Sequence, residues 1–167
     1  MDSSSRPRSR LSRYARELRI LSWRERRLLA RAWFLLPLMA LWIRVAGFRR
    51  VRAFLEGRSS IPEEPDEKQS PRHRLEEART VARIITAAAS HPLFSISCLP
   101  RSLTLWWILR QRGMDSEIRI GVRRQGELLE AHAWVEYQEV PLNDTPDVHR
   151  RYAAFDPIAW PQGATWV

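Results

Sequence analysis

The sequence contains little of several residue types that would define its chemistry. It has one cysteine, Cys98, so no disulfide can form within the chain and any thiol chemistry belongs to this residue. The six glycines are isolated from one another, so there is no glycine-rich phosphate loop and we expect no ATP binding. The four histidines are scattered without paired ligand spacing, so we expect neither a metal site nor a cofactor.

Long apolar runs are also missing. The longest run, residues 32–43, contains Pro37 and is shorter than the roughly 20 residues that a membrane-spanning helix needs. It predicts a buried helix, or a helix that lies on a membrane surface. Residues 1–10 are polar and charged, without the apolar stretch and small-residue cleavage site of a secretory signal. With the single cysteine, this predicts a cytoplasmic protein.

Charge is distributed unevenly along the chain. Residues 1–58 contain 15 arginines and four acidic residues, a net charge of +11, whereas residues 59–167 contain 13 basic and 15 acidic residues, a net charge of −2. A basic arm on a near-neutral body predicts a partner with a negative surface. The candidates are an acidic protein, an anionic membrane and nucleic acid. Nucleic acid is not expected, because aromatic residues are not interleaved with the basic ones in the usual pattern.

Composition and periodicity divide the chain into four segments. Residues 1–10 are mostly Ser, Arg and Pro and predict a disordered tail. Residues 11–56 have helical periodicity and form a basic helical extension. Residues 57–70, rich in Pro, Ser and acids, predict a linker or long loop. Residues 71–167 form the predicted core domain.

Local signals mark where helices begin and end in the extension. Ser22 and Glu25 have the spacing of a capping box, in which each side chain bonds the other residue's backbone N–H. Pro37 should kink or break the helix that follows. Gly47 then separates a short helix over residues 48–56.

The core begins with helices and ends with strands. Ser70 and Pro71 fit a cap and first helical position for a helix over residues 71–89. A second helix is expected from about Cys98 to Gln111, with Gly113 at its left-handed exit. Alternating apolar residues then predict antiparallel strands over residues 116–123, 128–137 and 140–143. This order predicts an α+β fold.

One cysteine and one histidine have the surroundings of a catalytic pair. At the start of a helix, unpaired amides and the helix dipole should lower the pKa of the Cys98 thiol. The backbone N–H of Cys98 or Leu99 could also hold an oxyanion. His132 is predicted on a strand, on the same face as Glu130 and Trp134. The alternatives are an unreactive buried thiol and a structural histidine.

A third group must orient the imidazole of such a pair. A hairpin with a three-residue loop at 137–139 would place Asp144 opposite His132, with Cβ atoms about 4.5–5.5 Å apart. A two-residue loop would place Thr145 there instead. Asp144 can equally serve as a turn or helix-cap residue. The other candidates for the orienting acid are Asp147 and Asp156.

Three motifs resemble those of a known family. The segments CLPRSL at 98–103, AHAWVE at 131–136 and Asn-Asp at 143–144 resemble the Cys, His and Asp motifs of the transglutaminase-like superfamily. The closest resemblance is to the leader peptidases of lasso-peptide biosynthesis, over roughly residues 71–156. It implies a transglutaminase- or papain-like core, in which a cysteine at a helix start packs on an antiparallel sheet.

The resemblance also implies an activity and partners. Cys98 would attack the bond between leader and core of a ribosomally made precursor peptide, His132 would move the proton and Asp144 would hold His132. A separate leader-binding protein (a RiPP recognition element) would deliver the precursor, and a lasso cyclase would take the product. The basic helices are a candidate docking surface for such an assembly, with a weak membrane-surface contact as a further expectation.

Two other functions fit the same sequence. In the implied peptidase reaction, water would release the leader from a thioester on Cys98; an acyltransferase of the same fold would resolve this thioester with an amine in place of water. A non-catalytic binding module would use the basic arm on nucleic acid or membrane, and Cys98 would then have no role.

Overall fold

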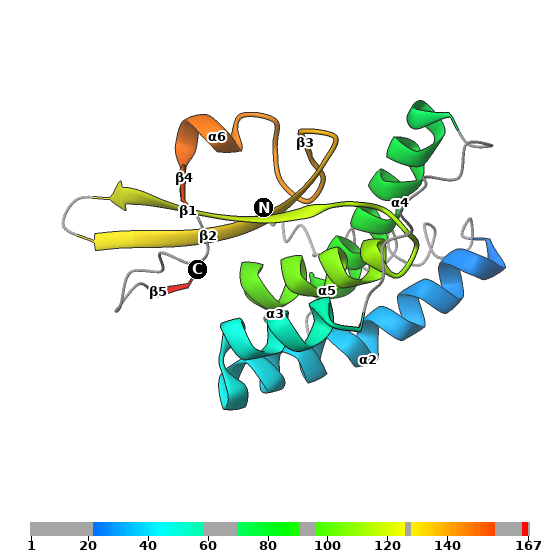
Figure 1. The fold of residues 1–167 in the computed structure, drawn as a ribbon, viewed down its shortest axis with the longest axis horizontal. Helices are drawn as coiled ribbons and strands as arrows, with labels where there is room; N and C mark the ends of the chain where they lie inside the picture. Colours follow the sequence, from blue (N-terminus) through cyan, green and yellow to red (C-terminus); the bar gives the residue numbers. More distant parts are fainter. Residues whose placement is uncertain (1–21, 59–69, 91–95, 126–127, 156–164, 167) are drawn as a thin grey trace, which may run out of the picture.

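The computed structural model describes residues 22–58, 70–90, 96–125, 128–155 and 165–166. Figure 1 shows a long two-stranded hairpin with α2 (Trp23–Ala46) and α5 (Cys98–Arg110) on one side and the short helix α6 (Val148–Arg151) on the other. Helix α5 lies between the hairpin and α2. The predictions of a disordered tail at 1–10 and of most of the loop at 57–70 lie outside the described residues.

Two helices form the described part of the basic extension. α2 spans Trp23–Ala46 and begins with the predicted capping box, in which Glu25 Oε2 accepts from the Ser22 N–H at 2.7 Å. The helix does not break at Pro37, because packing of its buried face in the core outweighs the one backbone hydrogen bond that proline removes. Gly47, at φ 81°, then separates α2 from α3 at Phe48–Glu56, as predicted.

The two helices of the predicted core also have the expected bounds. α4 spans Pro71–Ala89, and the Ser70 side chain accepts from the backbone N–H of His73 at its start. α5 spans Cys98–Arg110, and Gly113 beyond it has the left-handed φ of 68° expected of a helix exit.

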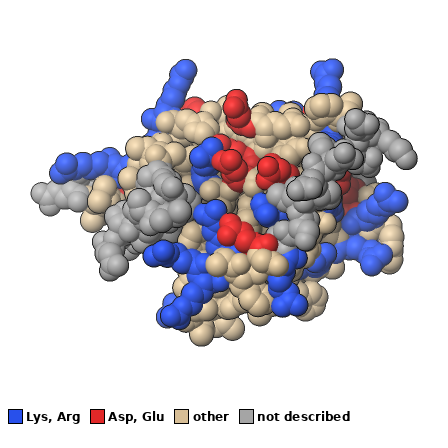
Figure 2. All heavy atoms as spheres, in the orientation of Figure 1, with Lys and Arg blue, Asp and Glu red and all other residues tan. Residues whose placement is uncertain are grey.

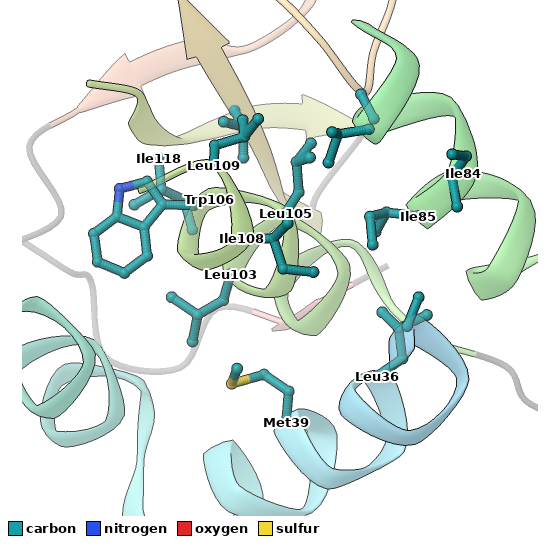
Figure 3. Packing of buried hydrophobic residues seen from close by; sticks show 14 of the residues in the cluster. Leu36, Met39, Ile84, Ile85, Leu103, Leu105, Trp106, Ile108, Leu109 and Ile118 are labelled. Carbon is teal, nitrogen blue, oxygen red and sulfur yellow. The ribbon is translucent and has the colours of Figure 1, made fainter. Parts of the chain in front are cut away.

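One hydrophobic core joins these helices. Leu36 and Met39 of α2 lie opposite Leu103 and Ile108 of α5, with Ile85 of α4 beside them (Figure 3). All five are nearly or fully buried. α2 therefore packs as part of the same core as α4 and α5, although its composition sets it apart from the rest of the chain.

The sheet is mostly antiparallel. Its strands are ordered β3-β2-β1-β4, and β5 pairs in parallel with β2. The short helix α6 at Val148–Arg151 precedes β4. The α+β prediction is confirmed. The strand bounds are β1 Glu117–Gln125, β2 Leu128–Tyr137, β3 Val140–Pro141, β4 Ala153–Phe155 and β5 Thr165–Trp166.

The loop between β2 and β3 differs from the prediction. Tyr137 pairs with Val140, so the loop has two residues, Gln138 and Glu139, and the predicted three-residue loop is wrong. Both loop residues have left-handed φ values, 51° and 63°. Such turns match the twist of the flanking strands, but they usually contain Asn or Gly, and neither is present to reveal this one.

Candidate active site

Cys98 lies where α5 meets the sheet. It is the first residue of α5, is 4% exposed, and packs with Leu99, Ile120 and Ala133. Ile120 and Ala133 are paired neighbours on β1 and β2. The helix start thus holds the thiol against the centre of the hairpin, next to the residue that follows His132.

An interruption in the strand pairing explains why α5 docks here. On the edge of β2 away from β1, the described residues of β5 pair with β2 up to Ala131, and the pairing with β3 begins near Val135. Backbone groups of alternate residues point to the same edge, so the N–H and C=O of Ala133 face this gap. α5 satisfies both, because Ser102 Oγ donates to the Ala133 carbonyl at 2.9 Å and the Cys98 sulfur hydrogen-bonds the Ala133 backbone.

The thiol is not activated in the way that its helix position predicts. Burial raises the pKa of Cys98 above its usual value. Backbone hydrogen bonds from Ala133, Leu99 and Cys98 itself, and the positive charge of Arg101, lower that pKa and only partly offset the burial. The expectation of a lowered pKa is therefore wrong for this structure: the helix-start amides do face the sulfur, but desolvation outweighs them.

His132 and Asp144 are in direct contact. His132 Nε2 hydrogen-bonds Asp144 Oδ2, and both side chains are mostly buried. Because Asp144 engages Nε2, the ring nitrogen left to exchange a proton with a thiol is Nδ1. A carboxylate in this position holds the imidazole in one orientation and fixes which ring nitrogen is free.

Asp144 reaches His132 by a different route from the one predicted. The two-residue loop puts Thr145, not Asp144, in register with His132, but the β2–β3 pairing ends before it reaches either residue. The chain is held there by Asn143, whose Oδ1 accepts from Val135 N at 2.8 Å and whose Nδ2 donates to Ser102 Oγ at 2.9 Å. Asn143 takes the place of a backbone partner where β3 ends, which brings the next residue against the imidazole.

Asp144 is ionised at neutral pH. Burial is the largest single effect and raises its pKa, but hydrogen bonds from the Thr145 backbone, His132 and Arg151 together lower the pKa below its ordinary value. The side-chain contacts of Asp147, the first alternative, are with Thr145 and Arg151. Asp156, the second, lies outside the described residues.

The family model described as transglutaminase-like superfamily matches residues 39–156, which include Cys98, His132 and Asp144. This chain belongs to the transglutaminase-like superfamily. That superfamily includes cysteine peptidases and acyltransferases. Neither the curated proteins nor the solved structures contain a significant match. The matched range begins within α2, so part of the basic extension is included in the superfamily domain.

Two aromatic rings flank the candidate histidine of this transglutaminase-like domain. The His132 ring stacks with Tyr152 at 4.8 Å and with Trp134 at 6.1 Å between ring centroids. Gly121 pairs with His132 on the neighbouring strand, and a Cβ there would lie 3.0 Å from both Trp134 and Tyr152. A glycine is therefore needed for the rings to approach. Sequence reasoning missed Gly121 and Tyr152, because their proximity depends on strand pairing and on α6.

Carboxylates fix these aromatic side chains. Tyr152 Oη donates to Glu130 Oε1 at 2.7 Å, and burial, followed by this hydrogen bond, raises the pKa of Tyr152 to about 12. Trp134 Nε1 donates to Glu136 Oε1 at 2.6 Å. The two aromatic rings beside the imidazole are thus held in place by hydrogen bonds, and Asp144 holds the imidazole itself at Nε2. Among the described residues there is no group of three His, Cys, Asp or Glu side chains that could hold a metal ion.

Proposed function

We propose that this protein is a cysteine peptidase that removes the leader from a ribosomally made lasso-peptide precursor in the cytoplasm. The observation that carries the proposal is the arrangement around Ala133. The Cys98 sulfur bonds its backbone, and the preceding residue, His132, is held by Asp144. Membership in a superfamily that includes cysteine peptidases supports it, and so does the resemblance of the motifs at 98–103 and 131–136 to those of leader peptidases.

The proposed reaction uses this arrangement in two steps. The Cys98 sulfur attacks the carbonyl carbon of the last leader residue, and His132 takes the thiol proton and gives it to the leaving amine of the core peptide. The leader is then held as a thioester on Cys98. Water, deprotonated by His132, then attacks the thioester carbonyl. The C–S bond breaks, His132 returns the proton to the Cys98 sulfur, and the leader leaves with a free carboxylate. Asp144 keeps the imidazole oriented throughout.

The proposal includes partners. A leader-binding protein delivers the precursor, as the resemblance to the leader peptidases implies. The free core amine then passes to an ATP-dependent cyclase. The buried state of Cys98 agrees with a peptidase that needs its partner complex before the scissile bond can reach the sulfur.

The decisive test is cleavage of precursor peptides encoded beside the gene, with and without the leader-binding protein encoded there. Mass spectrometry should detect free leader and free core peptide with the wild type, and neither product with Cys98→Ala. Cleavage that survives in Cys98→Ala would refute the proposal. A leader–enzyme thioester trapped by acid quenching would support it directly.

A matched pair of acids tests the role of Asp144. Asp144→Asn removes the group that contacts His132, whereas Asp147→Asn changes a carboxylate that contacts Thr145 and Arg151 in the same loop. We expect Asp144→Asn to lower kcat by roughly 10²- to 10⁴-fold, and Asp147→Asn to stay close to wild type. The reverse ranking would show that Asp144 does not orient His132.

An acyltransferase is the second candidate function, because the superfamily also includes such enzymes. It differs only in the step that resolves the thioester. Adding a primary amine or hydroxylamine to the cleavage reaction would distinguish the two. A leader that carries the added amine as its main product favours transfer, and a leader with a free carboxylate favours hydrolysis.

A further inference from the structure

One face of α2 is apolar and exposed. Phe34, Leu38, Leu41 and Val45 follow one another at intervals of four, three and four residues, which places them in a single stripe along the helix. Each is between 57% and 79% exposed. Scattered apolar residues are normal on protein surfaces, but a continuous stripe of large ones indicates an interaction site.

The opposite face of the same helix is already occupied. Leu28, Ala32, Leu36 and Met39 are buried against α4 and α5 in the main core. α2 is long and apolar enough to cross a membrane by length and composition. A spanning position would require the helix to withdraw these four side chains from the core. The helix can therefore meet a membrane only lengthwise, through its exposed stripe.

Basic residues lie at both ends of the stripe. Arg27 and Arg31 precede it on α2, Arg44 is at its far end, and Arg49 and Arg50 follow on α3; all five are exposed. Among the described residues, the structure gives no ion pair to Arg27, Arg44, Arg49 or Arg50. In Figure 2, basic side chains lie on both sides of an uncharged area at the lower edge, where Figure 1 places α2 and α3.

Within the part of the chain that the structure describes, acidic side chains on α2 and α3 do not neutralise these arginines. Residues 22–58 contain nine arginines and two glutamates. Glu25 is engaged in the capping box with Ser22, and Glu56 pairs with Arg52. Among the described residues, this face therefore combines an apolar stripe with arginines at each end that no acidic side chain pairs with.

We propose that α2 and α3 bind the surface of an anionic lipid bilayer, with α2 lying in the membrane plane. The stripe enters the boundary between headgroups and acyl chains, and the flanking arginines contact lipid phosphates. The apolar stripe matches the acyl-chain side of this boundary, and the arginines at its two ends match the anionic headgroups. Nucleic acid offers phosphates but no apolar layer for Phe34 and Leu38, and an acidic protein surface would leave that stripe exposed.

The test measures binding of the full-length protein to vesicles by flotation. Vesicles of phosphatidylcholine with phosphatidylglycerol should bind the protein, and this binding should weaken with added salt. Pure phosphatidylcholine vesicles should bind it much less. Equal binding to both vesicles, or no binding to either, would overturn the proposal.

Two sets of variants locate the binding face. Phe34→Ser with Leu38→Ser should weaken binding at least about tenfold. The matched control is Leu128→Ser with Leu129→Ser, which changes two other exposed apolar residues at the hairpin end and should leave binding unchanged. If both pairs lose binding equally, or neither does, the face is misassigned.

A charge pair provides the second, independent variant set. Arg49→Gln with Arg50→Gln should weaken binding roughly 30-fold, at about 1 kcal/mol for each arginine near an anionic surface. Arg72→Gln with Arg150→Gln removes two other exposed arginines and should have a smaller effect. If the Arg49→Gln, Arg50→Gln protein keeps vesicle binding but no longer forms a complex with the leader-binding protein, the face is a protein interface and the membrane proposal is wrong.

None of the substituted residues belongs to the candidate active site, so cleavage of the precursor in solution should be unchanged in all of these variants.

Discussion

The hydrogen bonds of Asn143 predict a measurable stability loss. Asn143→Ala removes the acceptor of the Val135 N–H and the donor to Ser102 Oγ, at 2.8 and 2.9 Å. A net contribution of about 1 kcal/mol for each hydrogen bond gives a loss of about 2 kcal/mol in the free energy of unfolding. The groups left behind, Val135 N–H and Ser102 Oγ, belong to fully buried residues, so about 2 kcal/mol is the lower end of the expected loss.

The assay is urea unfolding followed by tryptophan fluorescence, which the eight tryptophans make sensitive. The midpoint should fall while the slope with urea stays constant, since the change alters stability and not the surface exposed on unfolding. Asp115→Ala is the control: its side chain is exposed and lies 3.8 Å from Arg110, so it should change stability by less than about 0.5 kcal/mol.

A double-mutant cycle with Ser102→Ala separates the bond itself from general disruption. Ser102 is fully buried and bonds both Asn143 and the Ala133 carbonyl, so the two substitutions should be non-additive by about 1 kcal/mol. Additive effects, or a loss below about 0.5 kcal/mol for Asn143→Ala, would refute the argument that Asn143 holds this loop.

Three further predictions concern the candidate site. Gly121→Ala places a Cβ 3.0 Å from the buried Trp134 ring and should lower the free energy of unfolding by about 1–3 kcal/mol in urea titrations; an unchanged midpoint would show that the ring moves freely. Because burial raises the Cys98 pKa, iodoacetamide should react slowly at neutral pH and faster as the pH rises, and Arg101→Gln should shift this dependence to still higher pH. A downward shift would contradict the proposed effect of Arg101. The lowered pKa of Asp144 means that its ionised form stabilises the fold above the unfolded value, about 3.9, and that this contribution is lost as the pH falls through the lower folded value. Asp144→Asn should therefore lose less stability than wild type on acidification, and equal losses in urea titrations across this range would disprove the linkage.

Local signals in the chain determined most of the secondary structure. The capping box at Ser22 marked the start of α2, Gly47 separated α3, and Ser70 with Pro71 marked the start of α4. Alternation of apolar residues predicted β2 with its correct bounds. Each of these features depends on residues within a few positions of one another, where capping, backbone freedom and strand periodicity act directly.

Local signals in the sequence predicted the candidate site only in part. Cys98 and His132 could be nominated because a helix start and a strand are local features. Asp144 was nominated through a register that is wrong, and its contact with His132 depends on Asn143, which bonds residues eight and 41 positions away. The turn residues that set the true register, Gln138 and Glu139, have none of the usual composition of their turn type.

The sequence by itself determined the helices, the main hairpin, the uneven charge and the residues that can carry thiol chemistry. Only the tertiary structure decided the raised pKa of Cys98, because desolvation depends on what packs over the sulfur and not on its place in a helix. It also decided which face of α2 is covered. A helix that is apolar on all sides carries no local record of where the core lies, so the exposed stripe became visible only once α4 and α5 occupied the other side.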